Sequence, residues 1–332
     1  MNQKGLDKLG EFLENYLDCE IQISNPIKLS GGAIQQNWGL DVFVSSGEWA
    51  GNQKMVLRLD ADTSVSASHS RSEEFAILKV AYENGVSVPK PLISSEDKSL
   101  FGSAFFLMSR VSGISEGHRL VKQTEHTKLV EELGQNLARI HAIPLTSPEL
   151  SFLPSPPENP AGESIRLYRS FLDNLSQPHP AIEWGLSWLE RNLPPGKEIV
   201  LCHRDYRTGN IIVEEGKLKA ILDWEFAGWS DPMEDIFWFT AKCWRFGKYD
   251  RSAGGLGKRE DFYHAYETTS GRQVDLSFQI FWEVMAHVRW AVIACQQAER
   301  YTIGNEKSIE LALTAHVVPE LELEILSLTM EG

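Results

Sequence analysis

The alternation of apolar and polar stretches in residues 199–228, "IVLCHRDYRTGNIIVEEGKLKAILDWEFAG", constrains the fold of this chain most strongly. The stretch "IVLC" predicts a buried strand. The stretches "NIIV" and "LKAILD" predict two further strands, joined at "EEGK" by a hairpin with Gly216 in its turn. The chain between the first strand and the hairpin is therefore expected to be a polar loop at the edge of a small sheet.

Four polar side chains flank the predicted hairpin. His203, Asp205 and Asn210 precede it, and Asp223 follows its second strand. Because the two outer ends of a hairpin lie side by side, we expect Asn210 beside Asp223, with Asp205 close by. Each of these could singly be an ordinary turn residue, since Asp and Asn favour turns. Together they predict a cluster of oxygen ligands.

Such a cluster suits chemistry on a phosphate. Mg²⁺ binds hard oxygen ligands and keeps several waters, so one carboxylate and one amide oxygen suffice as protein ligands. The metal neutralises charge on the nucleotide phosphates, while a separate carboxylate accepts or orients the hydrogen of the attacking hydroxyl. We therefore assign Asn210 and Asp223 to the metal and Asp205 to the hydroxyl.

The segment "HRDYRTGN", followed by "ILDWEFAGWSDPMED", resembles the catalytic segment of the aminoglycoside phosphotransferase and choline kinase superfamily, relatives of the protein kinases. The family pattern is His, any residue, Asp, four residues and Asn, with a later Asp after an apolar strand. The residues that match this pattern, and then a second signature downstream, are His203, Asp205, Asn210 and Asp223, and Asp231, Pro232 and Asp235. The resemblance extends over nearly the whole chain.

The resemblance implies a two-lobed, protein-kinase-like α+β fold that binds ATP and Mg²⁺. It also implies that Asp205 is the catalytic base and that His203 supports the loop. His203 can equally be a buried histidine that caps the loop, which agrees with that structural role. Asp231 and its acidic neighbours could bind a cationic substrate, but we favour helix capping and orientation of the active site.

The pattern along the rest of the chain fits two lobes. Residues 1–110 are expected to form an N-terminal nucleotide-binding lobe, a mostly antiparallel sheet with an amphipathic helix before it and one helix within it. Residues 111–332 carry helical periodicity and are expected to form the catalytic and substrate-binding lobe. "SAGGLGKRE", residues 252–260, lacks the first glycine and final Ser/Thr of a P-loop, and we interpret it as a flexible loop.

The family has a basic residue on the third strand that holds the nucleotide phosphates and pairs with a helix glutamate. Arg58 in "VLRLD" stands where lysine is usual, and its planar fork must pair with different geometry. Glu74 is the best candidate for the partner, with Glu73 as the alternative. Arg58 could otherwise be a solvated residue on an edge strand.

Two further segments of this lobe are expected to meet the nucleotide. Ser30 and Gly31 in "LSGGAIQQN" would cover the phosphates with backbone N–H groups, or else form a plain hairpin turn. The segment "FFLMSRVSG" resembles the connection between the lobes, where the backbone near Met108 and Arg110 would meet adenine.

Composition argues against several classes of partner. The chain has 32 basic and 46 acidic residues, and the resulting net charge of −14 opposes binding to nucleic acid or an anionic membrane surface. The four cysteines are scattered without metal-ligand spacing, and no segment has the pattern of a secretory signal or a membrane span. We therefore expect a cytoplasmic protein. No feature of the sequence indicates the oligomeric state.

The expected activity is transfer of the γ-phosphate of ATP to a hydroxyl of a small molecule. The acceptors left open are aminoglycosides, choline-like amino alcohols, sugars and hydroxyacyl thioesters, the last because the sequence is similar to the kinase domain fused to some acyl-CoA dehydrogenases. The alternative is a nucleotide-binding regulator without catalysis, which Arg58 and the incomplete glycine pattern favour. The intact set of Asp205, Asn210 and Asp223 favours an enzyme.

Overall fold

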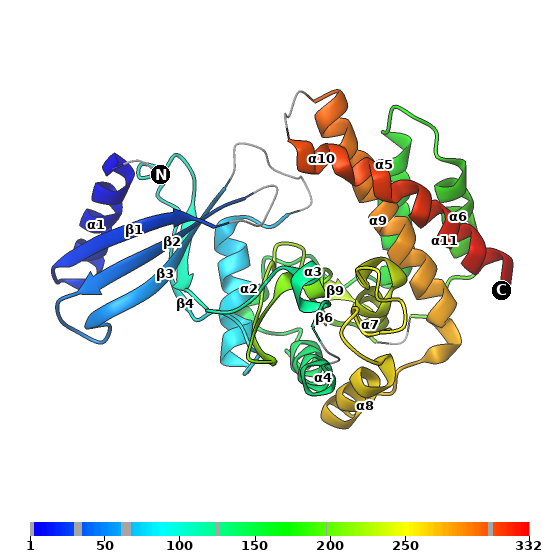
Figure 1. The fold of residues 1–332 in the computed structure, drawn as a ribbon, viewed down its shortest axis with the longest axis horizontal. Coiled ribbons are helices and arrows are strands. Elements are labelled where there is room, and N and C mark those ends of the chain that lie inside the picture. Colours follow the sequence, from blue (N-terminus) through cyan, green and yellow to red (C-terminus); the bar gives the residue numbers. More distant parts are fainter. Residues whose placement is uncertain are drawn as a thin grey trace. The chain divides into compact units, whose positions relative to one another are not determined.

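The structure is a computed structural model that describes residues 3–29, 35–60, 68–123, 126–196, 198–304 and 308–331. The chain forms two compact units, each assembled from segments that are separated in the sequence (Figure 1). The first unit consists of Met1–Gly113, Thr146–Phe152 and Ile212–Phe226, and the second of Ile114–Leu145, Leu153–Ile211 and Ala227–Gly332. The first is rich in strands and the second is mostly helical, which confirms the predicted α+β class.

The first unit is built on an antiparallel sheet with the strand order β1-β2-β3-β5-β4. A helix precedes this sheet, a second helix follows its third strand, and a hairpin and a short 3₁₀ helix from later in the chain complete the unit. These elements are α1 (Gln3–Leu17), β1 (Ile21–Lys28), β2 (Gln35–Val44), β3 (Gly51–Asp60), α2 (Arg71–Glu83), β4 (Pro91–Ser95), β5 (Phe105–Ser109), η1 (Pro148–Leu150), β7 (Ile211–Glu214) and β8 (Lys217–Ile221).

The two helices cover opposite faces of the sheet. Leu9 of α1 packs into one core with Leu57 of β3, whereas the ring of Phe75 in α2 lies 5.7 Å from the ring of Phe106 in β5. Successive residues of a strand point to opposite faces, so Arg58, next to Leu57, points toward α2. Residues 55–59 of β3 are consequently buried on both faces.

The start of α2 determines which of its two neighbouring glutamates faces the sheet. Ser70 is the N-cap, and it forms a capping box in which the Glu73 side chain accepts the Ser70 backbone N–H. Glu73 is thereby used at the helix end, and Glu74, one position later, is buried.

The second unit packs helices around the long helix α9. Apolar residues of this helix form much of the core of the unit, and Met285 and Val292 are among the buried ones. The helices and strands of the unit are α3 (Gly117–Leu120), α4 (Thr127–His141), α5 (Pro160–Asp173), α6 (Pro180–Arg191), β6 (Val200–Cys202), η2 (Thr208–Asn210), β9 (Gly228–Ser230), α7 (Pro232–Thr240), η3 (Lys242–Trp244), α8 (Arg259–Ser270), η4 (Leu276–Phe278), α9 (Gln279–Thr302), α10 (Ile309–Thr314), η5 (Ala315–Val317) and α11 (Val318–Glu331).

The strands predicted around the polar loop are present. The stretch "IVLC" contains β6, which pairs antiparallel with β9, and Cys202 lies opposite Gly228. The predicted hairpin is formed by β7 and β8, and its turn residues Glu215 and Gly216 both have positive φ, as a two-residue type I′ turn requires. Because α7 begins directly after β9, the β6–β9 pair brings the polar loop next to the first turn of α7.

The prediction of a flexible loop at residues 252–260 is wrong for most of that segment, because residues 253–257 are buried. The Thr208 hydroxyl donates a hydrogen bond to the carbonyl oxygen of Gly254 at 2.7 Å. Gly254 has φ of +57°, and a β-carbon there would overlap with Thr208 and Phe239. Glycine in this segment therefore permits close packing against the polar loop rather than mobility.

The length and hydropathy of the helices bear on whether any of them could cross a membrane. Within the described ranges, none has an apolar stretch of the length needed to cross a membrane.

Candidate functional site

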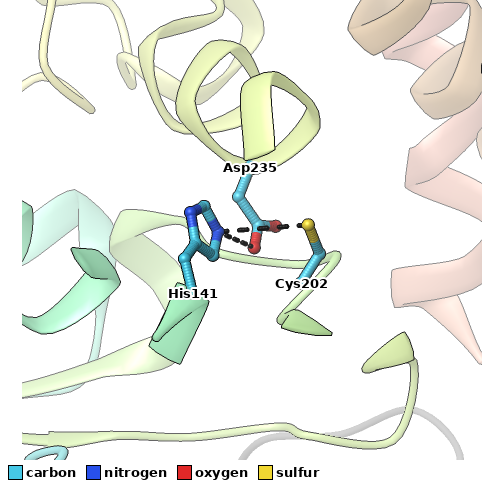
Figure 2. A group of neighbouring side chains, drawn as sticks. All are labelled: His141, Cys202 and Asp235. Atoms are coloured by element: carbon cyan, nitrogen blue, oxygen red, sulfur yellow. Dashed lines mark hydrogen bonds and ion pairs between the residues drawn. The ribbon is translucent and has the colours of Figure 1, made fainter. Parts of the chain in front are cut away.

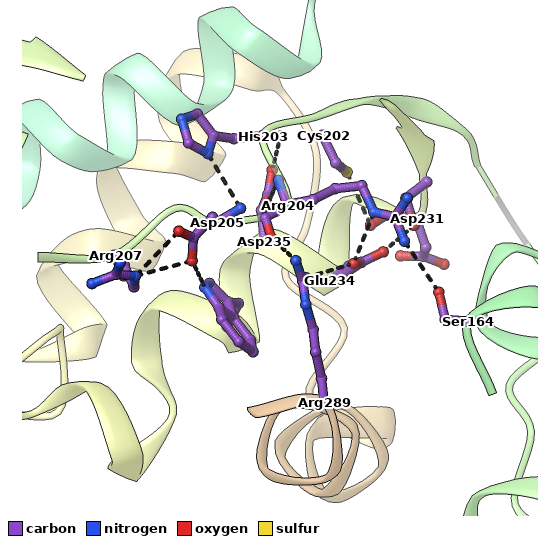
Figure 3. Close-up of polar contacts among 12 residues, drawn as sticks. Ser164, Cys202, His203, Arg204, Asp205, Arg207, Asp231, Glu234, Asp235 and Arg289 are labelled. Atoms are coloured by element: carbon purple, nitrogen blue, oxygen red, sulfur yellow. Dashed lines mark hydrogen bonds and ion pairs between the residues drawn. The ribbon is translucent and has the colours of Figure 1, made fainter. Parts of the chain in front are cut away.

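The loop that follows β6 is fixed by the carboxylate of Asp235 in α7 (Figure 3). Asp235 Oδ2 accepts the backbone N–H of His203 at 2.6 Å, and Oδ1 accepts that of Arg204 at 2.7 Å. Asp235 is fully buried. Arg204 has φ of +61°, a left-handed conformation that residues other than glycine rarely adopt. The two hydrogen bonds therefore stabilise an otherwise unfavourable turn directly before Asp205.

A buried hydrogen-bonded group lies behind Asp235 (Figure 2). His141 Nε2 lies 3.3 Å from Asp235 Oδ2, and His141 Nδ1 lies 2.9 Å from the Tyr266 hydroxyl. Burial raises the pKa of the Asp235 carboxyl, but the hydrogen bonds and charges of His141 and His203 outweigh this and lower it below its usual range.

Among the described residues, His141, Cys202 and Asp235 are the one group of three His, Cys, Asp or Glu side chains close enough to share a metal ion. Both ring nitrogens of His141 and both oxygens of Asp235 already have protein partners. Burial also raises the pKa of the Cys202 thiol well above its usual range, so it stays protonated. The group is therefore a support for the loop rather than a metal centre.

Asp205 is held by three side chains. The Asn210 Nδ2 donates to Oδ2 of Asp205 at 2.5 Å, and the Trp238 Nε1 donates to Oδ1 at 3.2 Å. The Nε of Arg207 donates to both oxygens, at 3.0 and 3.2 Å. The Asp205 side chain is 15% exposed to solvent. The structure thus brings Asp205 and Asn210 together, whereas Asp223 belongs to the first unit.

His203 is fully buried beside this carboxylate. Its Nδ1 accepts the backbone N–H of Asp205 at 3.2 Å, and its ring packs edge-on against Tyr206 at 5.9 Å. These contacts are those of a residue that supports the loop.

Arg289, which sequence reasoning did not assign to the site, contacts the loop from α9, and Glu234, one of the acidic neighbours of Asp231, pairs with it. The guanidinium of Arg289 in α9 lies 4.4 Å from the ring centre of Trp238 and donates to the carbonyl oxygen of Arg204. Glu234 accepts from Arg289 at 3.1 Å and from Arg204 at 3.2 Å. Arg289 interrupts the apolar run "VRWAVIAC", and a charge inside a buried helix face is the signal that could have identified it.

The first unit carries a separate charged cluster around Arg58. The Nη2 of Arg58 lies 2.6 Å from Glu74 Oε1 and 3.1 Å from Asp223 Oδ1. Arg58 is only 4% exposed. Burial lowers its pKa, but the charges of Glu74, Asp223 and Glu225 outweigh this and raise it overall. The pairing of Arg58 with Glu74 rather than Glu73 is thus present.

Arg71, which the sequence analysis did not select, joins this cluster. It forms ion pairs with Glu74, with Asp60 at 2.8 Å and with Glu225 at 3.9 Å. Two arginines therefore face four carboxylates, those of Glu74, Asp223, Asp60 and Glu225, and the formal balance is 2 − 4 = −2. Such an excess of negative charge favours the binding of a cation.

The two predicted metal ligands have the donor atoms that Mg²⁺ requires. Asn210 uses its Nδ2 for Asp205, and its Oδ1 accepts no hydrogen bond from any residue that the structure describes. Asp223 uses Oδ1 for Arg58, and within the described ranges its Oδ2 has no donor. Hard carboxylate and amide oxygens are the ligands that Mg²⁺ prefers. Each of the two residues, taken by itself, therefore offers an oxygen of the kind that the ion binds.

The nucleotide contacts expected at residues 30, 31, 108 and 110 stay predictions. Ser30 and Gly31 lie outside the described residues. Met108 lies in β5 opposite Val56, and the backbone N–H of Arg110 donates to the Lys54 carbonyl at 2.8 Å. The Arg110 guanidinium pairs with Asp41 of β2, so its side chain already has a structural partner.

Residues 29–271 match the profile of the family described as "Phosphotransferase enzyme family". The chain belongs to this family. Among curated relatives, acyl-CoA dehydrogenase family member 11 of Pongo abelii is 27% identical over 286 residues, which cover 82% of this chain and 37% of that protein. The chain thus spans little more than a third of the length of this relative.

Solved structures of phosphotransferases share the fold. A putative aminoglycoside phosphotransferase from Ralstonia eutropha has a TM-score of 0.75 at 18% identity and covers 98% of both chains. A spectinomycin phosphotransferase in complex with ADP and spectinomycin has a TM-score of 0.66 at 14% identity, covering 97% of this chain and 98% of its own. These likenesses confirm the predicted kinase-like fold.

We predict that Asp235→Asn loosens the loop. Asparagine offers one acceptor oxygen and an NH₂ group that cannot accept the second backbone N–H, so one buried donor loses its partner at a cost of about 1–3 kcal/mol. Hydrogen exchange of the amides in residues 199–206 should become roughly tenfold faster or more. The matched control is Asp275→Asn, whose carboxylate accepts one N–H, that of Ser277, away from the loop. Equal exchange in the two variants would contradict the role of Asp235.

Asp231, the N-cap of α7, makes stability depend on pH. Burial raises the pKa of Asp231 to about 6. The hydrogen bond from the Met233 N–H lowers this pKa, and the charges of nearby carboxylates raise it. The unfolded pKa of Asp231 is about 3.9, so the folded state binds the proton more tightly, and this contribution to stability is lost as pH rises from about 4 to about 6. Asp231→Asn keeps the cap and removes the titration.

The variant should therefore be more stable than the wild type at pH 7.5, by about 3 kcal/mol, and nearly equally stable at pH 4. Urea unfolding at the two pH values measures this difference. The same stability difference at both pH values would show that Asp231 does not titrate as described.

Proposed function

We propose that this chain transfers the γ-phosphoryl group of ATP to a hydroxyl group of a small molecule. Membership of the phosphotransferase family provides the class of reaction. The observation that carries the proposal is the carboxylate of Asp205, which is held by Asn210, Trp238 and Arg207 but remains partly exposed. A fixed carboxylate with access to solvent is suited to bind a hydroxyl and take its proton.

In this proposal the acceptor oxygen attacks the γ-phosphorus, the bond from phosphorus to the leaving oxygen of ADP breaks, and the hydroxyl proton moves to Asp205. Asn210 and Asp223 would hold Mg²⁺, which when bound neutralises charge on the nucleotide phosphates. His203 and Asp235 keep the loop in place, so that Asp205 does not have to be ordered in each turnover.

Arg58 is the residue that we assign to the nucleotide phosphates in the first unit. Its guanidinium is oriented by Glu74 and Asp223, and a buried arginine held in this way offers fixed donors to a phosphate. We assign the backbone of Ser30 and Gly31 to the same phosphates and the backbone near Met108 and Arg110 to adenine. The ADP bound to the spectinomycin phosphotransferase supports an adenine nucleotide.

We propose an order in which the four acceptor classes should be tested. The acyl-CoA dehydrogenase family relative is 27% identical to this chain, whereas the two phosphotransferases of solved structure are 18% and 14% identical. That similarity supports testing a hydroxyacyl thioester as the acceptor first, before an aminoglycoside, an amino alcohol or a sugar. We place the reaction in the cytoplasm, where the free thiols of Cys202 and Cys295 stay reduced.

Asp205→Asn should lower kcat by about 100-fold or more, because the variant loses the general base but keeps the shape of the site. The Kd for MgATP should be unchanged, since Asp205 contacts the hydroxyl and not the nucleotide. Steady-state release of ADP and calorimetric titration measure the two quantities. Asp173→Asn, a change at an exposed carboxylate of the same unit, is the control. Turnover close to that of the wild type would refute the assignment of Asp205.

Asp223→Ala should remove the Mg²⁺ dependence of ATP binding. We expect the wild type to bind ATP much more tightly with Mg²⁺ than with EDTA, because Asp223 would hold the ion, and the ion when bound would neutralise charge on the phosphates. The variant should bind equally weakly in both conditions. Asp97→Ala, at an exposed carboxylate of the first unit, should behave like the wild type. A metal-dependent affinity retained in Asp223→Ala would exclude Asp223 as a ligand.

A further inference from the structure

Arg207 lies beside Asp205, and the proposed function uses it only to hold that carboxylate. The Nε of Arg207 donates to both oxygens of Asp205, at 3.0 and 3.2 Å. Arginine commonly binds a carboxylate with two nitrogens side by side, one for each oxygen. Here a single nitrogen serves both oxygens, and the outer end of the guanidinium extends beyond the carboxylate.

The outer end is held in position, and its N–H groups make no hydrogen bond to the residues that the structure describes. The guanidinium carbon lies 4.8 Å from the ring centre of Trp244, which fixes the plane of the group. Its Nη1 occupies space that a β-carbon at Gly209 would fill, so glycine at this position leaves room for it. Among the described residues, neither Nη1 nor Nη2 donates a hydrogen bond. The side chain is 26% exposed, so these donors are accessible.

The free donors belong to the side chain that holds Asp205, the carboxylate that we assign to the acceptor hydroxyl. A hydroxyl that gives its proton to Asp205 has its oxygen within hydrogen-bond distance of that carboxylate. The phosphorus must approach the same oxygen, and in the transition state the negative charge is spread over three equatorial phosphoryl oxygens. Fixed N–H donors aimed at such charge are among the strongest contributions to catalysis.

We infer that Arg207 is a catalytic residue whose outer N–H groups bind the phosphoryl group in transit while its Nε keeps hold of Asp205. One rigid guanidinium would then set the separation between the base and the phosphoryl group. The bonds that form and break are those of the proposed phosphoryl transfer, on which this inference rests, and Arg207 remains protonated throughout. The same donors could instead bind an anionic group of the acceptor itself.

Hydrolysis of MgATP without an acceptor distinguishes these two sources of the anion, because water then replaces the hydroxyl and no acceptor anion is present. Arg207→Met should lower kcat for hydrolysis by about 100-fold or more, in line with the loss of an arginine finger, and leave KM for ATP within about twofold. Arg207→Lys should be intermediate, because lysine keeps the charge but lacks the planar fork.

The control is Arg169→Met, since Arg169 is 29% exposed and pairs with Glu183 and Glu190 in the same unit. It should hydrolyse ATP at the wild-type rate. Melting curves establish that each variant is folded.

Binding of ADP with aluminium fluoride, a mimic of the phosphoryl group in transit, provides a readout that does not depend on turnover. The wild type and Arg169→Met should bind this complex more tightly than ADP alone, and Arg207→Met should bind both equally. Hydrolysis and fluoride binding at wild-type levels in Arg207→Met would overturn the inference. A raised KM for the acceptor in that case would assign Arg207 to the acceptor's own anion.

Failure of the proposed function gives a different result. A wild-type protein that transfers no label from γ-labelled ATP to any acceptor and does not bind the fluoride complex would refute the proposed function, and the role of Arg207 would fail with it. If the wild type hydrolyses MgATP and binds the fluoride complex, and Arg207→Met does so equally well, the proposed phosphoryl transfer stands and only the role of Arg207 is refuted.

Discussion

The carboxylate of Asp235 accepts the backbone N–H groups of His203 and Arg204, and the position of Asp205 depends on this contact. Pairing of β6 with β9 brings the loop to the start of α7, and His141 supports the carboxylate from behind. The left-handed turn at Arg204 is stable because both neighbouring donors are satisfied. The acid that we assign to the chemistry is thus placed by a second acid that never meets the substrate.

The net charge of −14 does not reveal that some arginines are held in place by neighbouring carboxylates. Arg58 in the first unit and Arg207 in the second are each fixed by carboxylates, Arg58 by Glu74 and Asp223 and Arg207 by Asp205. An arginine held in this way keeps its charge and loses little side-chain entropy when it binds an anion. A strongly acidic protein can therefore bind phosphate groups, provided that its arginines are fixed in place beforehand.

The parts predicted from the sequence are those that depend on short spacing. Asp205 meets Asn210 because the short helix η2 turns the chain back between them, and the capping box at Ser70 leaves Glu74 free to pair with Arg58. The contacts of Trp238 with Asp205 and of Arg289 with Arg204 join segments far apart in the chain, and no local pattern encodes such pairs. Residues 253–257 were misread because glycine permits close packing as readily as mobility.

The movement of label from γ-labelled ATP into a fractionated metabolite extract tests phosphoryl transfer most directly. The extract would be incubated with Mg²⁺ and either the wild type or the Asp205→Asn variant. The account predicts a labelled small molecule that only the wild type forms, and its mass would identify the acceptor. The same labelled product at the same rate with both proteins would contradict the account, because transfer would then proceed without the base on which the site is built.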